Sequence, residues 1–148
     1  MSANKQPTGE QYADLLLSQE GDEYEWGVKP HPSDPDPEEG DCSGYTAWGA
    51  NRLGVVPRFP HGSVVQWEHC RRHGTELPSI KDGIDTKGAL LFRVNIRGQS
   101  NHVAVSLGNG KTIEAMGERY GVRQGNAYGR GWNHAALVPG MEYDGWEV

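Results

Sequence analysis

The chain has 148 residues, of which 35% are hydrophobic, 9% aromatic and 23% charged, and its formal net charge is -6 at pH 7. This length suits one compact domain and is too short for two domains that each bury a sizeable core, so we expect a single domain over residues 1–148. The composition excludes a disordered chain, and no apolar run is long enough for a membrane helix. Because the Lys and Arg residues are few and scattered, we expect no nucleic-acid partner and no membrane partner.

Two Ser/Thr-x-x-Gln capping boxes mark the starts of helices in the first half of the chain. The first begins at Thr8 and opens a helix that stops at Gly21, and the second begins at Ser63 and opens a helix that ends at Gly74. Between them, residues 24–41 are rich in proline and acidic side chains, which regular elements do not tolerate. The sequence therefore predicts a long surface loop there.

The second half of the chain contains short segments that are rich in apolar and β-branched residues, which is typical of strands. Gly108, Asn109 and Gly110 separate two of these segments and form a strong hairpin signal. Together with the helices, the segments predict an α+β domain with an antiparallel sheet. The expected strands cover residues 88–95, 102–108, 111–117 and 134–139.

The two cysteines lie in different surroundings. Cys70 follows Trp67 by three residues on one helix face, which is typical of a small buried side chain. Cys42 follows Asp41, a good N-cap, so it lies in the first turn of a helix that ends before Gly54. Because the unpaired N–H groups of that turn stabilise a thiolate, Cys42 is a candidate nucleophile.

A nucleophilic thiol needs a base, and His102 is the candidate. It begins a predicted strand, and the alternation of that strand directs its ring away from the more apolar face. A three-residue hairpin loop would place Glu114 opposite Ala104 and diagonal to His102 on the same face, where it can orient the imidazole. A two-residue Asn-Gly loop would place Glu114 on the other face. The alternative orienting residues are Asn101, Ser106 and Glu118.

Two other groups of side chains have residue types that bind metals. His69 and His73 are one helical turn apart, but no second pair of ligands has the spacing of a zinc site. The carboxylates at Asp34, Asp36, Glu38 and Glu39 lie among prolines and lack the glycine-centred pattern of a calcium loop. We therefore expect solvated faces at both places, no metal and no cofactor.

Ordered motifs along the chain resemble those of the NlpC-type cell-wall peptidases. They are Tyr-Glu-Trp-Gly at 24–27, Asp-Cys-Ser-Gly at 41–44, Leu-Gly-Val-Val-Pro-Arg at 53–58, and the segment 102–115, which contains both His102 and Glu114. The resemblance spans about residues 10 to 140. It implies a papain-like α+β fold, with N-terminal helices packed on a central antiparallel sheet and the nucleophile at the N-terminus of a core helix.

The same resemblance implies an activity and residue roles. Members of the family cut peptidoglycan stem peptides, commonly after D-Glu at its γ-linkage to a diamino acid. By resemblance, Cys42 is the nucleophile, His102 the base and Glu114 the third polar residue. The resemblance further implies that Tyr24 lies beside the oxyanion, that Ser43 lines the pocket for the acyl-side residue and that Asp41 receives the amino end of the stem peptide.

Three features depart from the family pattern. The third polar residue is most often His, Asn or Gln, and Glu114 in its place resembles a branch found in bacteriophage lysins and tail-associated hydrolases. The usual Gly-Asp-Leu opening of the first sheet strand is Gly-Ala-Leu at 88–90. The acidic loop from Asp34 to Asp41 is unusually long, and we expect it to border the cleft because it leads directly into Cys42.

These observations lead us to expect a monomeric thiol endopeptidase that acts on bacterial peptidoglycan stem peptides, as a phage lysin catalytic domain or a tail-borne wall hydrolase. The first residues lack the basic and apolar regions of a signal peptide, so we expect synthesis in the host cytoplasm and action on the wall after release. The alternatives are an N-acetylmuramoyl-L-alanine amidase, an antibacterial toxin domain, and a non-catalytic wall-binding or tail module.

Overall fold

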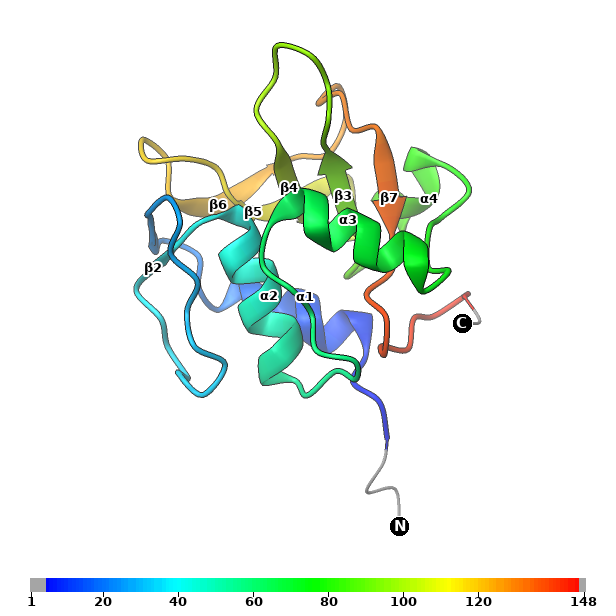
Figure 1. The fold of residues 1–148 in the computed structure, drawn as a ribbon, viewed down its shortest axis with the longest axis horizontal. Coiled ribbons are helices and arrows are strands. Elements are labelled where there is room, and N and C mark those ends of the chain that lie inside the picture. Colours follow the sequence, from blue (N-terminus) through cyan, green and yellow to red (C-terminus); the bar gives the residue numbers. More distant parts are fainter. Residues whose placement is uncertain (1–4, 147–148) are drawn as a thin grey trace.

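The structure is a computed structural model that describes residues 5–146 (Figure 1). Within that range no helix has both the length and the apolar character needed to cross a membrane. The helices are α1 (Gly9–Leu17), α2 (Cys42–Arg52), α3 (Ser63–Arg72) and α4 (Ile80–Asp85). The strands are β1 (Glu23–Tyr24), β2 (Glu39–Gly40), β3 (Leu90–Arg93), β4 (His102–Ser106), β5 (Lys111–Ala115), β6 (Val122–Asn126) and β7 (His134–Ala136).

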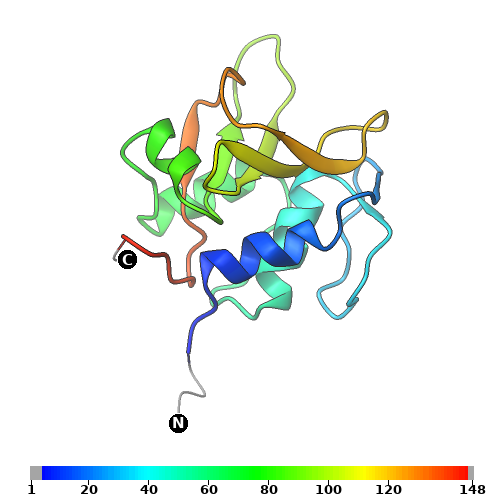
Figure 2. The ribbon, with the colours of Figure 1, turned by 180° about the vertical axis from the view of Figure 1, so that it is seen from behind.

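The predicted α+β architecture is confirmed. Five strands form one antiparallel sheet in the order β6-β5-β4-β3-β7. Helix α2 packs against β4 and β5, α1 packs against α2 and β5, and α3 packs against β7 (Figures 1 and 2). All of β4 and most of β3 are buried, so the centre of the sheet is covered on both faces. This packing fixes the start of α2 against the middle of the sheet.

Helix α1 begins as its sequence predicts. The Thr8 hydroxyl accepts a hydrogen bond from the backbone N–H of Gln11 at 3.1 Å, and the Gln11 side chain accepts one from the N–H of Thr8 at 2.9 Å. The helix ends at Leu17, earlier than expected. Gly21 has a φ of 100° and donates to the carbonyl of Val122 at 2.8 Å, so it forms the turn that joins this segment to β6.

The second predicted capping box is wrong. The N-cap of α3 is Gly62, whose φ is 98°, and Ser63 is already a helical residue without a capping hydrogen bond. The side chain of Gln66 is fully buried and donates to the carbonyls of Ser43, at 3.0 Å, and Pro60, at 2.8 Å. Because this amide satisfies backbone groups in the core, it ties α3 to the first turn of α2 and is not available to cap its own helix.

The hairpin between β4 and β5 has the longer of the two predicted loops. Val105 pairs with Ile113 and Ser106 with Thr112, and the N–H of Leu107 donates to the carbonyl of Lys111 at 2.9 Å. Residues 108–110 are therefore the three-residue loop. This register places Glu114 on the same face as His102.

Four elements were not predicted: β1, β2, α4 and β6. Strand β6 lies at the sheet edge and is largely exposed and polar, so it lacks the apolar alternation of an internal strand. Helix α4 has only six residues. The segment expected to be loop throughout contains β2, which pairs in parallel with β1. This short pair depends on contacts between distant residues, which local propensity does not predict.

Candidate active site

The candidate nucleophile lies where the sequence predicts it. Cys42 is the first residue of α2 and is partly exposed, whereas Cys70 is completely buried. Asp41 caps the helix by accepting a hydrogen bond from the N–H of Gly44 at 2.6 Å. Within residues 5–146, the backbone N–H of Cys42 has no hydrogen-bond acceptor. The thiol and a free N–H donor therefore lie together at the positive end of the helix dipole.

His102 and Glu114 form a buried pair on the sheet. The Nε2 atom of His102 lies 2.7 Å from Oε1 of Glu114, and the two residues are 9% and 4% exposed. Because Nε2 is occupied by the carboxylate, Nδ1 is the ring nitrogen that remains for Cys42. The alternative orienting residues lie elsewhere: Ser106 donates to the Ile84 carbonyl, Asn101 accepts from the Asn95 N–H, and Glu118 is exposed.

The electrostatics favour a charged imidazole and a charged carboxylate. Burial acts to lower the pKa of His102, but hydrogen bonding and charge from Cys42 and Glu114 outweigh it and raise this pKa to about 9. Burial likewise acts to raise the pKa of Glu114, but hydrogen bonds from His102, Arg130 and Thr112 lower it to about 2. An imidazolium at this position stabilises a neighbouring thiolate.

Arg130, Thr112 and Trp132 belong to the same cluster and were missed from the sequence. Arg130 binds Glu114 through both terminal nitrogens, with Nη2 to Oε1 at 2.7 Å and Nη1 to Oε2 at 3.2 Å. The Thr112 hydroxyl also donates to Oε2. The Trp132 ring stacks on His102 with centroids 5.9 Å apart, and the Arg130 guanidinium lies 5.0 Å from the Trp132 centroid. These contacts hold the carboxylate, and through it the imidazole, in one orientation.

Tyr24 is brought to the start of α2 by the β1–β2 pair. It is paired with Gly40, two residues before Cys42. Burial, together with the charges of Cys42 and Asp41, raises the pKa of Tyr24 to about 12, so its hydroxyl keeps its proton and remains a donor. Its place beside the oxyanion stays a prediction.

Asp41 and Ser43 flank Cys42 in the sequence and are nearly completely buried. Besides the helix N-terminus, the Asp41 carboxylate accepts hydrogen bonds from the Gly27 N–H at 2.9 Å and the Ser43 hydroxyl at 3.3 Å, and it lies 3.1 Å from Nε2 of His61. The structure thus gives Asp41 a structural role. Its contact with a substrate amine stays a prediction, as does the contact of Ser43 with the acyl-side residue.

The side chains that were considered as metal ligands do not form a metal cluster. Over the described residues, no group of three or more His, Cys, Asp and Glu side chains is placed to hold a metal ion. The rings of His69 and His73 are 4.6 Å apart.

The proline-rich, acidic loop that precedes α2 is attached to this helix, because Trp48 Nε1 donates to the Asp34 carbonyl at 2.9 Å and Arg52 donates to the Pro32 carbonyl at 3.0 Å.

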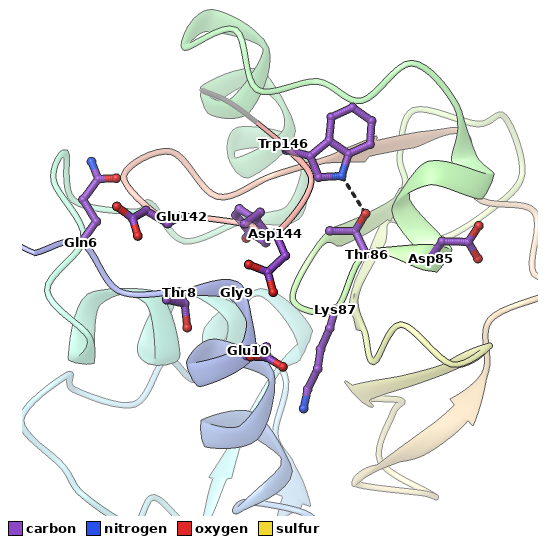
Figure 3. A pocket seen from close by; sticks show the side chains of 11 residues that line it. Gln6, Thr8, Gly9, Glu10, Asp85, Thr86, Lys87, Glu142, Asp144 and Trp146 are labelled. Carbon is purple, nitrogen blue, oxygen red and sulfur yellow. Dashed lines mark hydrogen bonds between the residues drawn. The ribbon is translucent and has the colours of Figure 1, made fainter.

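A cavity of about 720 Å³ lies away from this cluster (Figure 3). It is formed where the start of α1 meets the turn before β3 and the C-terminal segment, and Trp146 Nε1 donates across it to Thr86 Oγ1 at 2.9 Å. Lys87, on its wall, pairs with Asp14 at 2.8 Å. None of the candidate catalytic residues lines this cavity.

The paired charges predict how stability depends on pH. The pKa of His102 is about 9 in the folded protein against an ordinary value of 6.5, so the folded state holds this proton more tightly. Its stabilising contribution is complete below 6.5 and is lost as the pH rises through about 9. We therefore expect the free energy of unfolding, measured in urea by tryptophan fluorescence, to fall over this interval.

The His102→Ala variant should lack that fall, because it lacks the titrating group. At acid pH the free energy of unfolding should instead fall as the pH is lowered, because of Glu114. The pKa of Glu114 is about 2 against 4.5, so its contribution is present above 4.5 and is lost as the pH falls towards 2. An equal loss of stability between neutral and alkaline pH in parent and His102→Ala would contradict this account.

Comparisons with known proteins agree with the fold and the motifs. The NlpC/P60 family model matches residues 21–140. No curated protein matches the chain. Among solved structures, the NlpC/p60 domain of the peptidoglycan hydrolase SagA has a TM-score of 0.67 and 26% identity, over 87% of this chain and 97% of that one. The P60 domain of the M. avium subspecies paratuberculosis antigen MAP1204 has a TM-score of 0.66 and 28% identity, over 91% and 96%.

A third structure shares the fold within a longer chain. NlpC2 from Trichomonas vaginalis has a TM-score of 0.71 and 24% identity, over 93% of this chain and 48% of that one. The present chain thus spans about half the length of the Trichomonas protein and nearly all of the two separate domains.

Proposed function

The chain belongs to the NlpC/P60 family, and from this premise we propose that it hydrolyses amide bonds in the stem peptides of peptidoglycan with Cys42 as the nucleophile. The observation that carries the proposal is the convergence of three groups. Cys42 lies at the N-terminus of α2, His102 has one ring nitrogen free to face it, and Glu114 holds the other nitrogen at 2.7 Å. This is the arrangement of nucleophile, base and orienting group that thiol peptidases require.

The first half of the reaction makes a thioester. The Cys42 thiolate attacks the carbonyl carbon, and the electron pair of the C=O bond moves onto the oxygen. The backbone N–H of Cys42 and the hydroxyl of Tyr24 donate to this oxyanion. When the tetrahedral intermediate collapses, the C–N bond breaks and His102 gives its proton to the leaving amine.

The second half releases the acid. Neutral His102 takes a proton from a water molecule, whose oxygen attacks the thioester carbon. The C–S bond then breaks, and the thiolate and imidazolium are restored. Glu114 stabilises the imidazolium in both halves, and Arg130 and Thr112 keep the carboxylate in place. No step of this scheme uses a group from outside the chain and its substrates.

For the bond itself, we propose the γ-linkage between D-Glu and the diamino acid, and for the biological setting a phage lysin domain that reaches the wall after release. The family membership and the carboxylate at the third position support these assignments. Both assignments go further than family membership. The assignment of the bond can be tested directly, because cleavage of each candidate bond gives a different product.

The experiment is mass spectrometry of purified muropeptides after digestion with the parent and with Cys42→Ala. We expect new products that begin with the diamino acid, and none with the variant. Products that begin with L-Ala would replace this proposal by an amidase, because that bond joins the sugar to the peptide. Unchanged muropeptides that still bind the parent would favour a wall-binding module.

A further inference from the structure

A second cavity, of about 370 Å³, adjoins the candidate active site on the side of β6. His102 forms part of its wall, together with Arg93 from β3 and Arg130. The rest of the described wall includes Tyr120 and Asn126 but no Asp or Glu residue. A substrate bound at His102 would therefore meet an open space with basic walls.

The two arginines of this wall are not equivalent. Arg130 is neutralised by its two contacts with Glu114. Arg93 donates to the backbone carbonyl of Arg130 at 3.1 Å, and among residues 5–146 no carboxylate lies within ion-pair distance of it. Its Nε atom is buried and has no hydrogen-bond acceptor in that range. Arg93 thus contributes an uncompensated positive charge and at least one unused donor.

The charge of Arg93 lies close to a second cation, because Arg93 and Arg130 both lie near the ring of Trp132. The guanidinium of Arg93 lies 5.8 Å from the centroid of the Trp132 ring, and that of Arg130 lies 5.0 Å from the same centroid. Two cations at one ring repel each other, and the single carboxylate of Glu114 compensates only one of them. An anion in the cavity would remove this imbalance and would satisfy a buried donor at the same time.

The role of His102 in the proposed mechanism indicates which part of the substrate enters the cavity. His102 gives its proton to the leaving amine, so the residue that carries this amine lies against the His102 wall. We propose that the cavity binds a carboxylate on the leaving residue, with Arg93 as the specificity-determining contact. The inference rests on the proposed function, and it adds that the preferred leaving residue is an amino acid with a free carboxylate on its side chain.

The test compares two soluble stem peptides, each carrying D-Ala after the leaving residue. In one, the leaving residue is meso-diaminopimelic acid with its side-chain carboxylate free, and in the other this carboxylate is amidated, so the two differ by one charge. We expect the parent to cleave the free acid with a kcat/KM about tenfold higher, the effect of one charge-assisted contact, mainly through KM. Arg93→Gln should reduce that ratio to near one, and Arg93→Lys should keep part of it.

Arg72→Gln is the matched control, because it removes the same charge from an exposed position at the end of α3. It should leave the ratio at the parental value. Equal cleavage of both peptides by the parent, or an equal loss on both peptides in Arg93→Gln, would overturn the proposal.

Binding to Cys42→Ala, measured by calorimetry, separates the inference from the proposed function. A preference for the free acid that disappears in Cys42→Ala/Arg93→Gln supports the carboxylate site even if the parent cleaves neither peptide, in which case only the proposed hydrolysis fails. No preference in binding overturns the carboxylate site, whether or not the parent is an active hydrolase.

Discussion

His102→Ala should lower kcat on stem peptides by roughly a thousandfold, within the range that a positioned acid–base group contributes. The reason is that the variant loses both the base that faces Cys42 and the proton donor for the leaving amine. We expect the fold to persist, since Glu114 keeps its two contacts with Arg130. Steady-state cleavage and a thermal melt of the same preparation measure the two effects.

His73→Ala is the control for that experiment, because His73 is an exposed imidazole at the end of α3. Its turnover should equal that of the parent. A His102→Ala variant that retained more than about a tenth of parental turnover would show that His102 is not the general base.

The second large effect concerns Arg130 and Glu114 as a pair. Arg130→Met leaves a carboxylate whose side chain is 0% exposed with only one of its two cationic partners, His102. Removing one partner of a buried ion pair costs roughly 3 kcal/mol or more of unfolding free energy. Glu114→Gln removes the charge that stabilises the imidazolium, so we expect it to lower turnover while leaving substrate affinity unchanged.

The double variant Glu114→Gln/Arg130→Met should be more stable than the Arg130→Met single variant. Its amide oxygen can still accept from Nε2 of His102, and no unpaired carboxylate remains beside the missing guanidinium. We expect a coupling energy of about 1–3 kcal/mol from urea unfolding of the four proteins in the cycle. Arg72→Met, on the surface of α3, provides the uncoupled control. Strictly additive effects would show that Arg130 does not compensate Glu114.

Much of the fold was predictable because local signals agree with the tertiary structure. The Thr8 capping box, the Asp41 N-cap and the hairpin glycines each act within a few residues, so they can be interpreted without knowledge of the rest of the chain. The second capping box failed for the opposite reason. Gln66 makes its hydrogen bonds with Ser43 and Pro60, which lie outside its own helix.

Cys42 could be placed from the Asp41 N-cap, but the part of the candidate site on the sheet was predictable only within one strand pairing. Glu114 could be placed near His102 because both lie in the same hairpin, and the only uncertainty was the loop length. Arg130 and Trp132 follow the β6 edge strand, whose polar sequence lacks the strand pattern. The one available signal was Glu114 itself, because a carboxylate in an otherwise buried strand requires a cation nearby.

The central claim, that Cys42 is the nucleophile of a wall hydrolase, is tested most directly by limiting iodoacetamide on the native parent. Burial raises the pKa of the Cys70 thiol to about 12, whereas Cys42 is partly exposed and lies beside His102. Peptide mapping should therefore find the label on Cys42 first, more slowly in His102→Ala, and muropeptide cleavage should fall one for one with labelling of Cys42. Labelling of Cys42 no faster than Cys70, or full cleavage by protein labelled at Cys42, would contradict the account.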